Sequence, residues 1–360
     1  MPLRINPSFV IIHHLQQNRQ QKLQQSRQPN LLQLRLNQQL HPQHNRQIHR
    51  RLQKHPANLI LVKVKNNMIK EGLILKGIGG FYYVETADGV FECKAKGKFR
   101  KEGISPLAGD RVIITVRDDN KENTIDEIKE RKNKLRRPPV ANIDKLIIVV
   151  YTAKPYPNTL IIDKMTVLAE KHGIEPVIVI TKTDLENADE IKKTYRSAGY
   201  RVYLHSDETR ENLEEIRNEL NGCISAFTGN SGVGKSTLIN ALSPELTLET
   251  GEISDKLGRG RHTTRQAEIF HIGNGLVIDT AGFSSIDFAA DSVIFSSDLE
   301  EYFPEIRKHI GECKFTGCSH LGDKGCKISE LVDSGEISKS RYESYCTFFD
   351  EQKNLKKWNV

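Results

Sequence analysis

A glycine-rich octapeptide, GNSGVGKS at residues 229–236, constrains the fold of this chain more than any other feature. It follows the strand-like segment CISAFT and precedes the helical pattern STLINAL. The octapeptide fits the phosphate-binding loop GxxxxGK[ST], whose backbone N–H groups surround phosphates at the N-terminus of a helix. The strand-loop-helix context makes a glycine-rich turn without a ligand the weaker reading. The predicted phosphate-binding residues are Gly229, Asn230, Ser231, Gly232, Val233, Gly234, Lys235, Ser236 and Thr237.

The predicted phosphate-binding loop also implies a metal ion and a carboxylate that binds this ion. Lys235 would reach the β- and γ-phosphates, and the Ser236 hydroxyl would ligate Mg²⁺. The segment LVIDTAG, residues 276–282, is an apolar strand that ends in Asp279, with Gly282 expected near the γ-phosphate. Asp279 would bind the magnesium through water. A DxxG motif is weak alone, but this one ends an apolar strand that follows the phosphate-binding loop.

A second loop, TKTD at residues 181–184, follows the strand-like PVIVI and is the candidate for binding a nucleotide base. The Asp184 carboxylate can accept two hydrogen bonds from guanine N1–H and the 2-amino group, neither of which adenine offers, while the Lys182 stem lies along the ring plane. This pattern favours GTP over ATP, and an ordinary polar loop is the alternative. Ser206, which ends YRVYLHS, is a weaker candidate for the loop that meets guanine O6. The predicted guanine-binding residues are Thr181, Lys182, Thr183 and Asp184.

Strand-like and helical segments alternate around these loops. Helical patterns at about 160–172, 187–198 and 213–220 separate KLIIVVY, PVIVITK and YRVYLHS, so we expect a parallel sheet covered by helices. The guanine loop precedes the phosphate-binding loop, whereas in Ras-like GTPases it follows. The sequence therefore predicts a circularly permuted domain in which the segment after Gly282 runs directly into the C-terminal region.

Residues 1–67 differ in composition from the rest of the chain. Of 53 Lys and Arg, twelve lie in residues 1–70, which hold no Asp or Glu, so the remaining 290 residues carry 41 basic and 46 acidic side chains. The segment is rich in Gln, His and Arg, and it has too few apolar residues to fold alone. We expect either a disordered extension or a chain whose true start is Met68. A secretory signal is excluded for lack of an apolar core, and a transit peptide is disfavoured by the scarcity of serine.

From Met68 the pattern becomes short and strand-like. About five strands, with turns at Gly79-Gly80 and Asp88-Gly89 and one strand at 111–116, suggest a small barrel such as the OB-fold. Three aromatic residues lie close in sequence to five cationic residues. The aromatics could stack on bases while the cations contact phosphates, as in proteins that bind single-stranded nucleic acid. Equally, the aromatics could pack in the core while the cations form a solvated face. These residues are Phe81, Tyr82, Tyr83, Lys94, Lys96, Lys98, Arg100 and Lys101.

Four potential metal ligands crowd near the C-terminus. Cys313, Cys318, His320 and Cys326 form the pattern C-x₄-C-x-H-x₅-C. Three thiolates and one imidazole complete a tetrahedral shell for Zn²⁺, so we expect one structural zinc ion, with free buried cysteines as the alternative. Six cysteines are too few for a disulfide scaffold, which favours a reducing, cytoplasmic setting. The longest apolar run, LIIVVY, falls far short of the ~20 residues of a membrane-spanning helix, so no membrane insertion is expected.

The order TKTD, GNSGVGKS, GRHTT, DTAG and CKFTGCSHLGDKGC, after a barrel that opens with GGFYYV, resembles the RsgA family of ribosome small-subunit-dependent GTPases over about residues 68–360. The resemblance implies a bacterial assembly factor that binds the 30S subunit late in maturation and hydrolyses GTP when the subunit stimulates it. One departure is Thr181, where guanine loops usually carry Asn. Threonine keeps a hydroxyl but lacks the amide that braces the phosphate-binding loop, which bears on affinity and not on base choice.

The segment GRGRHTTR, residues 258–265, stands where a first switch would be. By resemblance Thr264 coordinates Mg²⁺ in the GTP state, with Thr263 as the fallback. Phe283 follows DTAG, where Ras-like enzymes use Gln to orient the attacking water, and phenylalanine cannot do this. His262 is the candidate for that task, and the alternative is a histidine that contacts ribosomal RNA or is merely exposed.

The sequence thus predicts an α/β fold: a circularly permuted P-loop GTPase domain with an N-terminal OB-like β-barrel and a C-terminal zinc-binding helical domain. The expected partners are the 30S subunit with its 16S rRNA and GTP or GDP with Mg²⁺, and the expected state is a monomer. Two alternatives are an RNA-binding assembly chaperone with GTP as a structural ligand and a permuted GTPase of the large subunit. The expected domains are an extension at 1–67, the barrel at 68–136, the GTPase domain at 137–297 and the zinc domain at 298–360.

Overall fold

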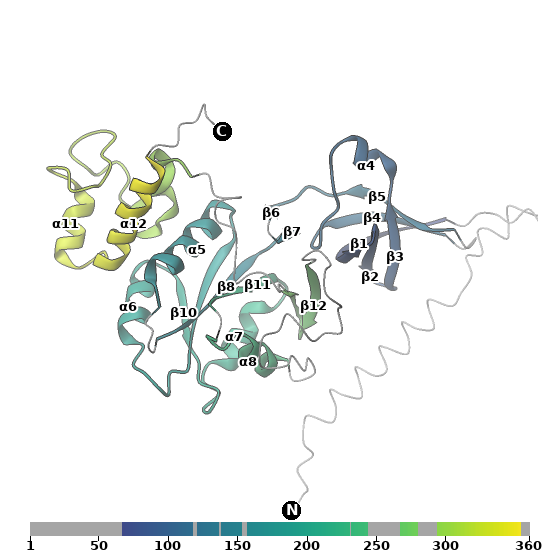
Figure 1. Cartoon of the computed structure of the whole chain (residues 1–360), viewed down its shortest axis with the longest axis horizontal. Helices are drawn as coiled ribbons and strands as arrows, with labels where there is room; N and C mark the ends of the chain where they lie inside the picture. Colours follow the sequence, from purple (N-terminus) through teal and green to yellow (C-terminus); the bar gives the residue numbers. More distant parts are fainter. Residues whose placement is uncertain are drawn as a thin grey trace, which may run out of the picture. The chain divides into compact units, whose positions relative to one another are not determined.

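The computed structural model of the chain contains a mostly parallel sheet at its centre (Figure 1). The described residues are 67–117, 121–136, 138–152, 157–230, 232–243, 267–279 and 294–353. The strands run in the order β10-β9-β8-β11-β13-β12. All neighbours pair in parallel except β12, which pairs antiparallel with β13. The bounds are β8 Lys145–Tyr151, β9 Glu175–Thr181, β10 Arg201–Leu204, β11 Ile224–Thr228, β12 Glu268–Ile272 and β13 Gly275–Asp279. The parallel sheet predicted from the alternating pattern is confirmed.

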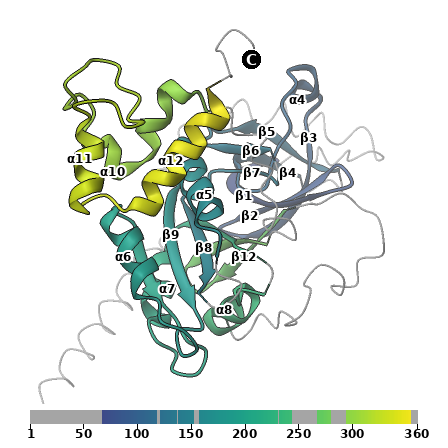
Figure 2. The same ribbon diagram turned by 60° about the vertical axis from the view of Figure 1, so that its left-hand side comes forward.

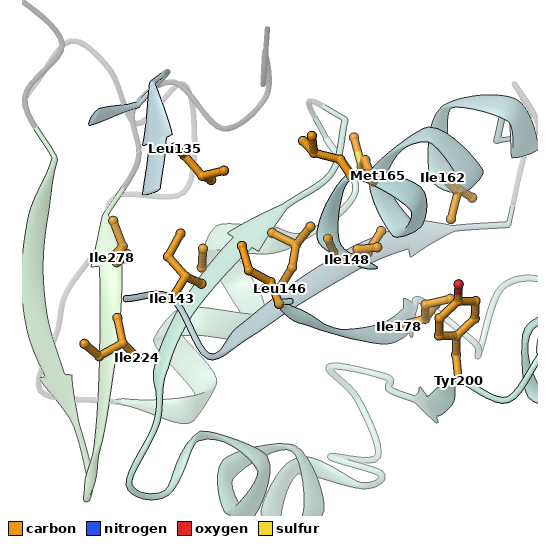
Figure 3. Packing of buried hydrophobic residues seen from close by; sticks show 14 of the residues in the cluster. Leu135, Ile143, Leu146, Ile148, Ile162, Met165, Ile178, Tyr200, Ile224 and Ile278 are labelled. Atoms are coloured by element: carbon orange, nitrogen blue, oxygen red, sulfur yellow. The ribbon is translucent and has the colours of Figure 1, made fainter. Parts of the chain in front are cut away.

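Helices cover both faces of this sheet. Their bounds, α5 Thr159–Lys171, α6 Asp189–Ser197, α7 Leu213–Leu220 and α8 Lys235–Leu242, agree with the predicted helices to within two residues. Successive side chains of a strand point to opposite faces, so Ile148 of β8 packs with Ile162 and Met165 of α5, whereas Val149 packs with Leu238 of α8. Figure 3 shows the first of these clusters, with Ile162 and Met165 projecting from the helix that lies over β8.

The N-terminal part is a closed five-stranded barrel. Its elements are β1 Asn67–Ile78, β2 Phe81–Thr86, β3 Gly89–Ala95, α4 Gly97–Lys101, β4 Arg111–Arg117 and β5 Asn123–Ile128. The barrel closes because β1 pairs with both β2 and β4, while β5 joins β3 to β4. Alternate residues point inward, and Ile74, Val84, Ile114 and Ile125 are fully buried in its core. The small barrel expected from the short strands is confirmed.

Barrel and central sheet are joined by several contacts. Strand β1 pairs with β12 at Lys76 and Glu268, and the side chains of these two residues form an ion pair of 2.6 Å. Another contact involves a hairpin of β6 Lys134–Arg136 and β7 Pro139–Ala141. At Gly109, φ is +91° and a Cβ atom would lie 2.0 Å from the Ala141 carbonyl oxygen, so this approach requires glycine. The predicted boundary between residues 136 and 137 falls inside the hairpin.

The C-terminal part is helical, with η2 Ser296–Tyr302, α10 Pro304–Arg307, α11 Lys327–Ser334 and α12 Lys339–Gln352. Its core includes Phe303 and Tyr345, whose rings meet edge to face with centroids 5.3 Å apart. Helix α12 lies against α5 of the central domain (Figure 2). Within the described part of the chain, no helix combines the length and the apolar character needed to cross a membrane.

A fully buried arginine joins α12 to α5. The Arg341 guanidinium donates to both carboxylate oxygens of Glu305, from Nε at 2.7 Å and from Nη2 at 3.2 Å, and from Nη1 to Asp163 at 2.7 Å. Its carbon Cζ lies 4.8 Å from the ring centroid of Phe303. Burial alone would lower the pKa of Arg341, but the carboxylates of Glu305 and Asp163 outweigh burial and raise it well above its ordinary value. The guanidinium is therefore held charged inside the molecule.

Candidate nucleotide and metal sites

The predicted phosphate-binding loop lies where β11 ends and α8 begins. Gly229 follows the last residue of the strand, and its φ of +146° would be strained for other residues. A Cβ atom at this position would lie 2.2 Å from the Val149 carbonyl oxygen, so only glycine lets the loop pass so close to β8. Gly234 is the N-cap of α8, and Ser236 and Thr237 lie in its first turn. The loop thus leads into a helix N-terminus, where backbone N–H groups are available to an anion.

Lys235 folds back over the mouth of this loop. Its ammonium donates to the carbonyl oxygens of Gly229 at 2.5 Å and of Asn230 at 3.0 Å. Burial lowers the pKa of Lys235, because an apolar surrounding disfavours the charged form. A phosphate bound above the loop would give the Lys235 ammonium a negatively charged partner.

Thr181 joins the predicted guanine loop to the predicted phosphate-binding loop. Its buried hydroxyl lies 2.5 Å from the carbonyl oxygen of Val233 and 3.1 Å from that of Val150 on β8. A hydroxyl has one hydrogen, so Thr181 donates to one of these two oxygens at a time. The short threonine side chain therefore contacts the phosphate-binding loop directly. This is the loop that an asparagine amide braces where guanine loops carry Asn at this position.

Lys182 adds a second link between the same loops. Its ammonium donates to the Gly232 carbonyl oxygen at 3.1 Å and lies 4.5 Å from the ring centroid of Tyr151, the last residue of β8. Such a cation–π contact orients the lysine stem. The sequence analysis missed Tyr151, which belongs to no motif, although its position at the end of an apolar strand next to the nucleotide loops is a usable signal.

The remaining guanine-loop candidates lie at the same edge of the sheet. Thr183 and Asp184 follow Lys182 directly, and the Asp184 side chain is exposed. The Thr183 N–H donates to the His205 carbonyl oxygen at 3.4 Å, which holds the guanine loop against the segment that follows β10. Ser206 is buried, and its hydroxyl accepts a hydrogen bond from the Glu208 N–H at 3.2 Å within its own turn.

Several predicted site residues cannot be described. Ser231, His262, Thr264 and Gly282 lie outside the described residues, as do the fallback Thr263 and Phe283. Asp279 is the last residue of β13, next to β11 in the sheet. Its backbone pairs with Glu268 of β12, so it ends a strand on the same sheet that carries the phosphate-binding loop.

The four predicted metal ligands converge. One donor atom from each of Cys313, Cys318, His320 and Cys326 lies within 4.8 Å of the others. The His320 Nδ1 atom is 3.4 Å from the Cys313 sulfur and 3.5 Å from the Cys326 sulfur. Three thiols and one imidazole nitrogen in this arrangement suit a tetrahedral metal ion with no open position. The residues therefore fit a structural metal centre.

Helix α12 holds the backbone of this cluster. The Tyr342 hydroxyl donates to the His320 carbonyl oxygen at 2.8 Å, and the Tyr345 hydroxyl donates to that of Ser319 at 3.1 Å. The adjacent Arg341 on the same helix reaches α5, as described above. The four candidate metal ligands and the nucleotide-binding domain thus both contact helix α12. The sequence analysis did not predict this connection.

The barrel surface pairs aromatics with cations. Lys94 lies 4.7 Å from the ring centroid of Phe81, and Lys76 lies 5.4 Å from that of Tyr83. Tyr82, in contrast, points toward the barrel core, where burial raises its pKa. Of the three adjacent aromatics, Phe81 and Tyr83 therefore lie on the outer face, and Tyr82 serves packing.

Family comparisons agree with this architecture. The sequence model described as RsgA GTPase matches residues 128–289, and that described as RsgA N-terminal domain matches residues 71–125. A curated relative from Halalkalibacterium halodurans, "Small ribosomal subunit biogenesis GTPase RsgA", is 44% identical over 293 residues, covering 80% of this chain and 98% of the relative. The protein of the same name from Bacillus subtilis is 43% identical over 297 residues, covering 79% and 98%.

Solved structures show the same relationship. The crystal structure of YloQ, described as a circularly permuted GTPase, matches with a TM-score of 0.66 at 38% identity and covers 80% of this chain and 96% of that one. YjeQ from Thermotoga maritima matches with a TM-score of 0.67 at 34% identity, covering 80% and 100%. With the predicted order of the guanine and phosphate-binding loops present on one parallel sheet, these likenesses establish that the chain belongs to the RsgA family of circularly permuted GTPases and is a GTP hydrolase.

Proposed function

We propose that the chain is a GTPase of small ribosomal subunit biogenesis, which binds the 30S subunit late in its maturation and hydrolyses GTP to GDP when the subunit stimulates it. The observation that carries this proposal is the contact of the Thr181 hydroxyl and the Lys182 ammonium with the phosphate-binding loop. It joins the base-selecting loop to the phosphate-selecting loop, as one bound guanine nucleotide requires. The names of the relatives support the choice of the small subunit as the target.

Within this proposal each end of the nucleotide has its own residues. The backbone of residues 229–237 surrounds the phosphates, and Lys235 neutralises the β- and γ-phosphates. Ser236 ligates Mg²⁺, Thr264 joins it in the GTP state, and Asp279 acts through water, with Gly282 at the γ-phosphate. Asp184 accepts from guanine N1–H and the 2-amino group, while Thr181, Lys182 and Thr183 hold the loop in place.

His262 is proposed to orient the attacking water in the complex with the subunit. Phe283 has no hydrogen-bonding group for this task, so another residue must supply it. A histidine has two ring nitrogens that can form a hydrogen bond with a water molecule. If His262 instead contacts RNA, its replacement lowers subunit binding and not the turnover of the bound complex.

The outer domains are proposed to make the contacts with 16S rRNA. Half-buried aromatics beside lysines on the outer face of the barrel, as at Phe81 with Lys94 and Tyr83 with Lys76, suit bases and phosphates of single-stranded RNA. The Cys₃His cluster is proposed to hold one structural Zn²⁺, which stabilises the C-terminal domain. The protein would act in the bacterial cytoplasm as a monomer. The domain bounds 68–136, 137–297 and 298–360 remain part of this proposal.

Stimulation by the ribosome tests this function directly. We expect the rate of multiple-turnover GTP hydrolysis to rise on addition of 30S subunits and to stay at its basal value with 50S subunits. Co-sedimentation with GDP, GTP or a non-hydrolysable analogue should show 30S binding that depends on the nucleotide. Binding without any stimulation would favour an assembly chaperone that uses GTP as a structural ligand, and stimulation by 50S alone would favour a large-subunit factor.

A change of base specificity tests the guanine site. Asp184→Asn should weaken GTP binding by about tenfold or more, because a neutral amide replaces a charge-assisted acceptor, a loss of roughly 1.5 to 3 kcal/mol. The same variant should bind xanthosine triphosphate more tightly than the natural protein does, since xanthine carries an oxygen where guanine carries the 2-amino group. Fluorescence titration with both nucleotides measures this. Equal GTP affinity in the variant removes Asp184 from the base site, and Asp189→Asn on α6 provides a control for loss of charge.

A further inference from the structure

Glu300 contacts one of the four candidate metal ligands and is not itself a ligand. It lies on η2, and its Oε2 atom is 2.8 Å from the Nε2 atom of His320. The His320 side chain is 3% exposed and that of Glu300 is 27% exposed, so the pair is mostly shielded from water. The other ring nitrogen, Nδ1, faces the sulfurs of Cys313 and Cys326 at 3.4 and 3.5 Å. The two nitrogens of this imidazole therefore face opposite partners.

This geometry assigns each nitrogen a task. A histidine binds a metal ion through an unprotonated nitrogen, so the ring proton must sit on the other one. With Nδ1 facing the thiols, Nε2–H donates to the Glu300 carboxylate. A carboxylate in that position holds the ring plane in place and makes the ligating nitrogen more basic.

We propose that Glu300 is a positioning residue of the metal centre, which orients His320 and raises the affinity of the site for Zn²⁺. The proposal rests on the metal site put forward above. Glu300 also ties the four candidate ligands to the domain core, because Leu299 and Phe303 on either side of Glu300 along the chain are both fully buried there. The metal would thus be held by the fold through η2 as well as through the two tyrosines of α12.

Zinc competition measures the effect in the full chain. Zinc-loaded natural protein, Glu300→Ala and Glu300→Gln are titrated with a chromogenic chelator of known zinc affinity. We expect the zinc affinity to fall about 10- to 100-fold in Glu300→Ala, as is typical when such a partner of a ligating histidine is removed. Glu300→Gln should lie between, because its amide oxygen still accepts the hydrogen bond without the negative charge. Glu301→Ala, an adjacent and exposed carboxylate, is the matched control and should keep the natural affinity.

Spectroscopy separates positioning from general stability. Nitrogen NMR of labelled histidine in the zinc-loaded protein should show His320 bound through Nδ1 with its proton on Nε2, and the shift of Nε2 should change in both Glu300 variants. The cobalt-substituted protein should show an altered ligand-field band in Glu300→Ala. A role confined to stability would lower the denaturation midpoint and leave both spectra unchanged.

The outcomes are distinct. Unchanged zinc affinity and spectra in both Glu300 variants overturn the proposal while the metal site stands. A natural protein that binds no zinc overturns the metal site itself. If Glu300→Ala does not fold, Glu300→Gln decides the matter by the same titration, since it keeps the size and the hydrogen-bond acceptor of the natural side chain.

Discussion

Replacement of Arg341 by methionine is expected to lower the free energy of unfolding by about 3 to 5 kcal/mol. The guanidinium is 1% exposed and is the partner of Asp163 and Glu305, whose side chains are 0% and 6% exposed. Methionine fills a similar volume but leaves two buried carboxylates without a counter-charge. Unfolding in guanidinium chloride, followed by circular dichroism, measures the decrease in the free energy of unfolding. We expect the contact between α12 and α5 to be the first to weaken.

Two further variants test this explanation. Lys339→Met removes a cation from the same helix, but its side chain is 82% exposed, so the stability should change by less than about 0.5 kcal/mol. The triple change Arg341→Met, Asp163→Asn and Glu305→Gln removes all three charges and should recover most of the loss, because the cost arises from unpaired buried charge. A triple variant as unstable as the single one would indicate that packing against Phe303, and not charge pairing, is what Arg341 contributes.

Replacement of Lys235 by alanine is expected to reduce kcat for GTP hydrolysis by on the order of 10²- to 10³-fold, as for other preorganised groups that stabilise developing charge. The ammonium already lies over the mouth of the phosphate-binding loop, where it contacts two carbonyl oxygens. The burial that lowers the pKa of this lysine also lowers the local dielectric, so an anionic phosphate should interact with it more strongly than with a solvated cation. Single-turnover hydrolysis with saturating GTP and Mg²⁺ separates this effect from binding.

The control for this change is Lys193→Ala, which removes an exposed cation from α6 of the same domain and should leave kcat unchanged. Lys235→Arg provides a second comparison, because it keeps the charge but replaces a compact ammonium with a planar guanidinium. A Lys235→Ala protein with natural kcat and a raised KM alone would show that the lysine binds ground state and transition state equally.

Local pattern was enough to predict several parts of this protein. The glycine-rich loop, the strand before it and the helix after it are adjacent in sequence, so backbone geometry and chain order define them together. The same holds for α7, whose predicted and observed bounds coincide, and for the Cys and His ligands, which lie within fourteen residues. In each case the residues that interact are close along the chain, or their periodicity states which face is buried.

Contacts between distant segments were decided only by the tertiary structure. Thr181 and Val233 are 52 residues apart, and Arg341 and Asp163 are 178 apart, so no local rule links them. Glu300 has no motif around it, and its role depends on which nitrogen of His320 it faces. The sequence by itself determined which chemistry the chain carries, because motifs are short and local. Only the folded chain decided which side chains hold those motifs in place, because packing selects partners by proximity in space and not by order along the chain.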